Sequence, residues 1–175
     1  MSPNQSTDAA LNGIRVIDFS RIVAGPHCTM CLADFGADVI KVEDTGKGDD
    51  LRSHKPPHIK CDSPYFLSLN RNKRSISINM AEPDGQAVIH DLLATADVLV
   101  ENFRTGVMEK YGVGYEDIKA RYPRLVYCSI SGYGREGSQA RRAAYDPVVQ
   151  AESGQMATNG STESGPMRTG LAVTD

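Results

Sequence analysis

The sequence predicts an α/β fold, a Rossmann-like and mostly parallel sheet with flanking helices. Short apolar runs rich in β-branched residues alternate along the chain with segments whose apolar residues recur at helical spacing. Gly, Pro and acidic residues stand at several of the junctions, where turns and helix starts are expected. Strands that alternate with helices predict βαβ units, and consecutive βαβ units build a parallel sheet.

The first predicted βαβ unit spans residues 13–43. The stretch GIRVIDFS (13–20) predicts a strand because it is rich in β-branched residues. Residues 24–37 predict a turn followed by a helix that closes at Gly36, since glycine adopts the left-handed conformation that ends many helices. The apolar run DVIKVE (38–43) predicts the second strand.

The middle of the chain begins with a polar stretch. Residues 44–64 are punctuated by Gly and Pro and predict a long loop. The alternating RSISINM (74–80) predicts a strand. Residues 82–96 predict a helix, because acids and Pro83 stand at its start and apolar residues follow at helical spacing. The run DVLVENF (97–103) predicts a buried strand.

The last third continues the alternation. Residues 115–122 predict a helix, residues 124–131 a strand, and residues 145–157 a further helix. Parallel sheets of this class bind ligands beyond the carboxyl ends of their strands, so a site is expected at that edge. The segments that leave the strands there start at Arg21, Glu43, Asn79, Glu101 and Ser131.

The composition is that of a globular protein. Of 175 residues, 40% are hydrophobic and 23% charged, and the formal net charge is −3. The lack of a basic surplus argues against nucleic-acid binding and polybasic membrane contact, and no apolar run approaches the roughly 20 residues that span a bilayer. The chain has no Lys or Arg before Arg15, which argues against a secretory signal or a transit peptide. We therefore expect a disordered tail over 1–10 and a cytoplasmic protein, with a mitochondrial location as the alternative.

The four cysteines, Cys28, Cys31, Cys61 and Cys128, are spread through ordinary sequence. Cys28 and Cys31 form one CxxC, but no second pair and no HxxxH partner follows. Free buried thiols are therefore expected, with neither a metal nor a redox centre.

Gly132, Gly134 and Gly137 form a literal GxGxxG after a predicted strand. A dinucleotide site needs a helix to open there at once, so that its amides meet the pyrophosphate, and an acidic residue about 20 positions on. The residues that follow, SQARRAAYD, are polar and carry no helical apolar stripe. A loop is favoured, and a nicotinamide-dependent dehydrogenase stays as an alternative that NAD(H) binding would test.

Two segments carry cations near predicted strand ends. ENFRTG (101–106) places Asn102 and Arg104 where donors can meet an anion, and Lys110 lies nearby. LNRNKRSI (69–76) places three cations just before a strand. Each segment taken alone fits an anion site or a solvated turn or edge.

Four longer blocks occur in one order and at close spacing: LNGIRVIDFSRIVAGPHCTMCLADFGADVIKVED, SLNRNKRSISINM, DVLVENFRTGVMEKYGVGYEDI and LVYCSISGYG. Together they resemble the class III CoA-transferases, the formyl-CoA transferase and CaiB/BaiF family, from about Leu11 to Asp175. Among subfamilies, YCSISGYG, YDPVVQAESG and RTGLAVTD look most like the succinate–hydroxymethylglutarate CoA-transferase type.

The resemblance implies a CoA-transferase whose substrate is an acyl-CoA, with no permanently bound cofactor and no metal. Members of the family are about twice this length, and two chains interlock as rings. We therefore expect residues 11–175 to form a Rossmann-like CoA-binding domain truncated at its C-terminus, with little activity of its own. Asp175 stands at the position of the family's nucleophilic aspartate. An inactive CoA-binding or oligomer-interfering remnant is the alternative.

The resemblance also assigns positions that contact CoA. They are Val23, Ala24, Ile78, Asn79, Met80, Ala81, Asn102, Phe103, Arg104, Lys110, Arg142, Ala143, Ala144 and Tyr145. Two positions depart from the formyl-CoA enzyme: Asp44 replaces an arginine near the nucleotide, and Ala143 replaces a lysine. Arg141 and Arg142 stand close enough to compensate for the second change.

A related reaction in the same family is disfavoured. The α-methylacyl-CoA racemase type pairs the aspartate with the histidine of a GHD block, and the aligned residues here are Ala144, Tyr145 and Asp146. The base is absent. A CoA transfer between a dicarboxylyl-CoA, such as succinyl-CoA, and a carboxylic acid needs only the carboxylate nucleophile and an oxyanion stabilised by N–H groups.

Overall fold

The computed structural model describes residues 9–54, 59, 62–172 and 174. They belong to two compact units, one up to Ile130 and one from Ser131. Residues 1–8 of the expected tail and the proposed nucleophile Asp175 lie outside the described residues. The single domain expected over 11–175 stays a prediction.

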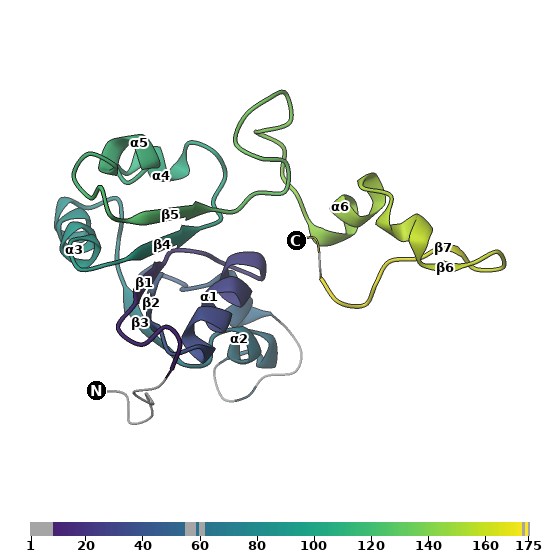
Figure 1. The fold of residues 1–175 in the computed structure, drawn as a ribbon, viewed down its shortest axis with the longest axis horizontal. Helices are drawn as coiled ribbons and strands as arrows, with labels where there is room; N and C mark the ends of the chain where they lie inside the picture. Colours follow the sequence, from purple (N-terminus) through teal and green to yellow (C-terminus); the bar gives the residue numbers. More distant parts are fainter. Residues whose placement is uncertain (1–8, 55–58, 60–61, 173, 175) are drawn as a thin grey trace. The chain divides into compact units, whose positions relative to one another are not determined.

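The first unit is a Rossmann-like α/β layer, which confirms the predicted fold class (Figure 1). Five strands pair in parallel in the order β3-β2-β1-β4-β5. Its elements in chain order are β1 (Arg15–Asp18), α1 (Ala24–Asp34), β2 (Asp38–Glu43), the 3-10 turn η1 (Asp50–Ser53), α2 (Pro64–Leu69), β3 (Lys73–Ser77), α3 (Pro83–Leu93), β4 (Val98–Glu101), α4 (Val107–Lys110), α5 (Tyr115–Ile118) and β5 (Val126–Ser129).

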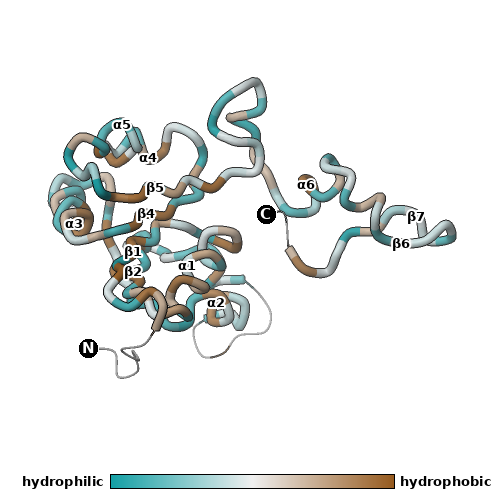
Figure 2. The backbone as a smooth tube through the Cα atoms, in the orientation of Figure 1, coloured by the Kyte–Doolittle hydropathy of each residue, from teal (hydrophilic) through white to brown (hydrophobic). Residues whose placement is uncertain are grey.

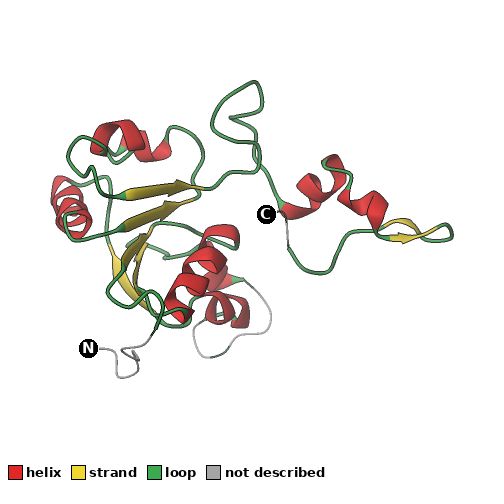
Figure 3. Cartoon of the chain, viewed as in Figure 1, coloured by secondary structure: helices red, strands yellow, loops and turns green. Residues whose placement is uncertain are grey.

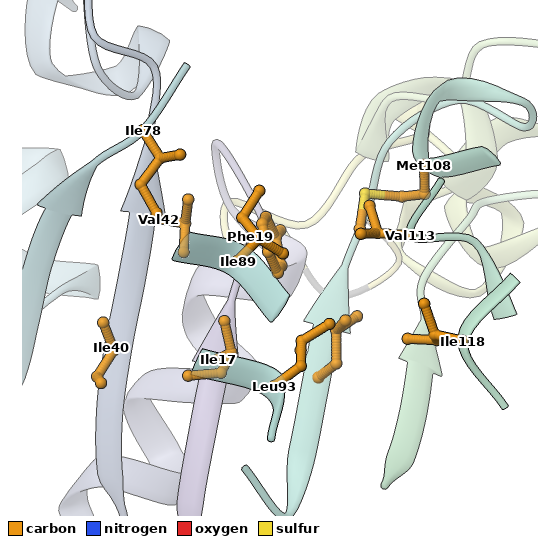
Figure 4. Packing of buried hydrophobic residues seen from close by; sticks show 11 residues of the cluster. Ile17, Phe19, Ile40, Val42, Ile78, Ile89, Leu93, Met108, Val113 and Ile118 are labelled. Atoms are coloured by element: carbon orange, nitrogen blue, oxygen red, sulfur yellow. The ribbon is translucent and has the colours of Figure 1, made fainter. Parts of the chain in front are cut away.

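Successive strand residues face opposite sides of the sheet and build two cores. Ile17 of β1 pairs in register with Ile40 of β2, and both belong to the larger cluster, which α3, α4 and α5 cover (Figure 4). Val16, one residue earlier, faces the other side with Val39 and packs under α1. The central strands β1, β2 and β4 are therefore buried on both faces, and Figure 2 shows β4 in the hydrophobic colour.

The polar stretch 44–64 is not only a loop, as the sequence had predicted. The Asp49 side chain accepts a hydrogen bond from the Leu51 N–H at 2.9 Å and starts η1. The Ser63 hydroxyl accepts from the Phe66 N–H at 3.0 Å and caps α2, whose first residue is Pro64. Residues that signal turns were here the caps of short helices.

The second unit is smaller and consists of α6 (Asp146–Glu152), the 3-10 turn η2 (Gln155–Thr158) and an antiparallel pair, β6 (Gly160–Ser161) with β7 (Gly165–Pro166) (Figure 3). The helix predicted over 145–157 is wrong in its second half, because Gly154 at φ 80° ends it. The helix predicted over 115–122 is likewise shorter and ends at Ile118. In the described part of the chain no helix is both long and apolar enough to cross a membrane.

Candidate functional site

A cavity of about 310 Å³ lies at the carboxyl edge of the sheet, where the sequence analysis expected a ligand. It opens beyond the ends of β1, β2 and β4 and beside the segment that follows β3. Buried Phe19, Val42 and Ile78 contribute an apolar wall. Its further lining residues are Arg21, Glu43, Asp44, Asn79, Met80, Ala81, Phe103, Val107 and Tyr111.

The cavity carries one cation, Arg21, and two carboxylates, Glu43 and Asp44, among its lining side chains. The Arg21 guanidinium lies over the Phe103 ring, 5.1 Å from its centroid. The Asp44 carboxylate accepts hydrogen bonds from the Gly46 and Lys47 N–H groups at 2.8 and 3.2 Å. These bonds lower the pKa of Asp44, and the positive charge of Arg21 adds to that effect. The cavity therefore presents the guanidinium of Arg21 together with the carboxylates of Glu43 and Asp44.

The segment after β3 is fixed by close packing. Gly85 in the first turn of α3 approaches the Asn79 carbonyl so closely that an added Cβ would meet its oxygen at 2.0 Å. The Asn79 side chain in turn accepts from the Ala81 N–H at 3.0 Å. This arrangement brings the predicted CoA-contacting positions 78–81 together along one side of the cavity.

The segment after β4 is held by a buried carboxylate. Glu101 accepts hydrogen bonds from the Phe103 N–H at 2.8 Å and from the Ser129 hydroxyl. The Asn102 side chain turns to the β1 end, where its oxygen accepts from the Arg21 N–H and its nitrogen donates to the Arg21 carbonyl, both at 2.8 Å. Of the predicted residues here, Phe103 lines the cavity, while Asn102 holds a neighbouring backbone.

The remaining predicted residues of the first unit do not line the cavity. Val23 and Ala24 stand at the start of α1. Arg104 is exposed, and Lys110 ends α4 with its ammonium 5.3 Å from the Tyr111 ring centroid. Arg21 is the functional candidate that the residue-by-residue reasoning missed, although its place directly after a strand was a usable signal.

A partly buried salt bridge between Arg52 and Glu43 supports the cavity from the β2 side. The N–H groups on Nε and Nη2 of Arg52 each donate to the Glu43 carboxylate at 2.7 Å. The Ser75 hydroxyl donates to the same carboxylate at 2.6 Å. Burial acts to raise the pKa of Glu43, but the bonds from Arg52, Ser75 and the Asp49 N–H outweigh it and lower that pKa to about 2. Glu43 is thus ionised at neutral pH and anchors Arg52, Ser75 and Asp49.

The second unit holds the other predicted positions. Arg142 pairs with Glu152 of α6, which also accepts from the Tyr133 hydroxyl at 2.6 Å. Ala144 packs where a Cβ on Gly132 would stand, and Tyr145, the N-cap of α6, is 66% exposed. Ala143 is exposed beside them.

Two buried side chains of α6 hold the segment that leads to Asp175. The Asp146 carboxylate accepts from the N–H and the hydroxyl of Thr174, each at 3.0 Å, and from Gln150 at 2.6 Å. The Gln150 side-chain oxygen accepts from the Thr169 N–H at 2.9 Å. This Asp146–Gln150 clamp fixes the backbone of the residue that directly precedes Asp175.

The GxGxxG segment has the geometry of a loop. Gly134 and Gly137 adopt positive φ angles of 79° and 85°, and α6 begins only at Asp146. No helix opens in residues 131–145, all of which the structure describes, so the amide cradle of a dinucleotide site is not formed there.

Cys28, Cys31 and Cys128 are free thiols, and Cys61 lies outside the described residues.

Comparison with known proteins gives a consistent result. The family model for CoA-transferase family III matches residues 11–175. A succinyl-CoA:glutarate CoA-transferase of Mus musculus is 48% identical over 94% of this chain and 38% of its own length. A formyl-CoA:oxalate CoA-transferase of Rhodopseudomonas palustris is 44% identical, with 95% and 39% covered. A crystal structure of a CAIB/BAIF family protein from Brucella suis, 41% identical, superposes with a TM-score of 0.88 over 94% of this chain and 44% of that one. The chain spans about two fifths of the length of these curated relatives.

Proposed function

The chain belongs to CoA-transferase family III, and on that premise we propose that it binds the CoA part of an acyl-CoA and supplies the nucleophile for CoA transfer to a carboxylic acid. We propose succinyl-CoA or a similar dicarboxylyl-CoA as the donor, in line with the names of relatives 44–48% identical. The cavity at the carboxyl edge of the sheet carries this proposal. It gathers Ile78, Asn79, Met80, Ala81 and Phe103, which the family resemblance had assigned to CoA from separate parts of the chain.

The chemistry of the cavity suits the proposed ligand. Its apolar wall and the Phe103 ring offer a surface for a base or for the pantetheine chain, and Arg21 offers a cation for a phosphate. Asp44 is charged, so it repels a phosphate placed directly beside it. We therefore propose that the phosphates lie toward Arg21 and that Asp44 accepts hydrogen bonds from a neutral part of the ligand.

In the proposed reaction, the Asp175 carboxylate attacks the thioester carbonyl and the tetrahedral oxyanion collapses with loss of CoA thiolate. The thiolate attacks the aspartyl carbonyl of the mixed anhydride, releases the donor acid and leaves an aspartyl-CoA thioester. The acceptor carboxylate expels the thiolate again, and attack of the thiolate on the new acyl group gives the product and regenerates Asp175. Each step exchanges one acyl bond for another, so a carboxylate nucleophile suffices without a metal.

The clamp in the second unit supports a catalytic role for the adjoining residue. A nucleophile must be placed to within about half an ångström of its productive position. Buried Asp146 accepts two hydrogen bonds from Thr174, the residue directly before Asp175, and a third from the buried Gln150 side chain. We also propose, from the family resemblance alone, that two chains interlock in the active enzyme.

Exchange of labelled succinate into succinyl-CoA tests the proposal. We expect a low level of exchange with the chain, its abolition in Asp175→Asn, and its retention in Glu163→Gln, a matched change of an exposed acid in the same unit. CoA binding without any exchange would support the inactive CoA-binding alternative. Exchange that survives in Asp175→Asn would refute the assigned nucleophile, and absence of CoA binding would refute the proposed site.

A further inference from the structure

The loop between β1 and α1, residues 20–23, is held by side chains from three distant parts of the first unit. The Lys41 ammonium donates to the Ser20 carbonyl at 2.7 Å. Asn102 binds both the N–H and the carbonyl of Arg21. The Ile22 N–H donates to the Asp49 carboxylate at 3.2 Å. Backbone groups of three successive residues are thus fixed by side chains rather than by the sheet.

Ile22 adopts a conformation that its side chain disfavours. Its φ is 68°, in the left-handed region, where a β-branched residue is a genuine outlier. The side chain is 38% exposed, so burial of the isoleucine does not account for the strain. Such a conformation persists only where the surroundings over-determine it. The bond from its own N–H to Asp49 is the contact that acts on this residue directly.

Asp49 and Lys41 form a buried ion pair behind the loop. Each residue is 1% exposed, and Lys41 Nζ lies 2.9 Å from Asp49 Oδ2. Asp49 further accepts from the Leu51 N–H, and its own N–H donates to Glu43 at 3.0 Å. A buried pair is weak evidence for stability, because desolvation offsets much of the attraction. Its bonds to Ser20 and Ile22, both in the loop, point to a role in placing that loop.

What the loop presents explains why its placement matters. Arg21 extends from the loop to the Phe103 ring at the cavity, and Val23 is the N-cap of α1. Gly25 in the first turn of α1 lies so close to Ser20 that an added Cβ would meet the serine Cβ at 2.1 Å. Loop and helix start therefore pack as one element, and a change at Ile22 moves Arg21.

We propose that Asp49, with Lys41 as its counter-ion, is a positioning residue that keeps Ile22 left-handed and thereby holds Arg21 at the cavity. The inference rests on the proposed CoA site, because Arg21 acts there on the ligand. Asn102 is a second positioning residue, because it binds the backbone of Arg21 and acts on the ligand through that residue. Restricting the loop before CoA arrives lowers the ordering cost of binding.

The test uses the 175-residue chain and a paired variant that leaves no unpaired buried charge. Lys41→Met with Asp49→Leu removes the acceptor for the Ile22 N–H. We expect its affinity for CoA, measured by calorimetry, to fall on the order of tenfold. Adding Ile22→Asn to the pair restores the affinity to within about threefold of the wild type, because asparagine adopts the left-handed conformation readily. Ile22→Val, which stays β-branched, is the matched control and restores nothing.

The positioning role is overturned if the paired variant binds CoA with wild-type affinity. It is also overturned if Ile22→Asn restores no affinity while circular dichroism shows an intact fold. Urea unfolding provides a readout that needs no ligand. In the wild-type background Ile22→Asn raises the midpoint relative to Ile22→Val, since it relieves strain that Asp49 imposes. We expect this difference in urea midpoint to be smaller in the Lys41→Met, Asp49→Leu background, because the loop has relaxed there. An equal difference in the two backgrounds would contradict the proposal.

These measurements distinguish failure of the proposed function from failure of the positioning role. A wild-type chain that binds no CoA defeats the proposed function, and the urea comparison still decides whether Asp49 strains Ile22. If the paired variant does not fold, the wild-type comparison of Ile22→Asn with Ile22→Val carries the decision. Equal midpoints there would mean that Ile22 is not held under strain.

Discussion

The two units of the chain are stabilised in different ways. The first unit contains every fully buried hydrophobic side chain of the described residues, in clusters on both faces of the sheet and under α2. In the described part of the second unit the buried residues are Asp146 and Gln150, and large apolar side chains such as Tyr145 and Leu171 are exposed. A hydrophobic core positions the cavity, whereas hydrogen bonds position the segment before Asp175.

This difference has a consequence for dynamics. Regions with few buried apolar contacts open locally at a small free energy, while core strands open only with global unfolding. We expect the cavity to be preformed in the isolated chain and the amide protection at Thr169 and Thr174 to be weaker than that of the core strands.

The largest expected effect is a core truncation in the first unit. Leu99, fully buried on β4, contributes to the larger cluster, and Leu99→Ala should lower the free energy of unfolding by about 2–5 kcal/mol. Leu171→Ala in the second unit, where the side chain is 73% exposed, should change it by less than about 0.5 kcal/mol. Urea denaturation of both variants makes the measurement. Similar losses would remove the contrast between the units.

Acid should destabilise the first unit through Glu43. Its pKa is about 2 in the folded chain against an ordinary value of 4.5, so its contribution is present above about pH 4.5 and is lost as the pH falls toward 2. The shift corresponds to about 3 kcal/mol. Urea midpoints measured between pH 6 and 2.5 should fall steeply in the wild type and in Glu163→Gln. A Glu43→Gln variant, already less stable at pH 6, should fall less steeply, and an unchanged slope would refute the assignment.

Loss of the Asp146–Gln150 clamp should affect only the second unit. Asp146→Ala leaves Thr174 and Gln150 without their acceptor, at a cost of about 1–3 kcal/mol for local opening. Hydrogen exchange read residue by residue should show protection lost at Thr169 and Thr174 and kept at Leu99. If protection fell throughout the first unit as well, the two regions would not be energetically separate.

The sequence predicted the centre of the sheet well because β1, β2 and β4 are buried on both faces. DVIKVE was predicted with the bounds that β2 has, and the carboxyl-edge rule located the cavity. The missed elements were short and depended on caps: η1 needs the Asp49 side chain, and α2 needs Ser63. Periodicity over a window cannot register a helix of six residues, nor did it register that Gly154 ends α6.

Roles that depend on tertiary contacts were beyond the sequence. Asn102 was assigned to the ligand, yet its side chain binds Arg21, 81 positions earlier in the chain. In the sequence Asp49 is one of several acids in a polar stretch. Its contacts with Ile22 and Lys41 form only when the chain folds. Five of the positions that the family resemblance assigned to CoA, residues 78–81 and Phe103, line the cavity, and their contact with CoA stays a prediction.

The smallest expected effect on stability concerns Arg142 in the second unit. Its pair with Glu152 joins two exposed side chains, and such pairs are screened by water and salt. Arg142→Ala should therefore leave the urea midpoint unchanged. Because Arg142 is a proposed CoA contact, the same variant should bind CoA more weakly, with the difference shrinking as salt is added. Arg135→Ala, a cation of the same unit outside the proposed contacts, is the matched control. A fall in stability without a fall in affinity would make Arg142 a structural residue and confine the CoA site to the unit that contains the hydrophobic core.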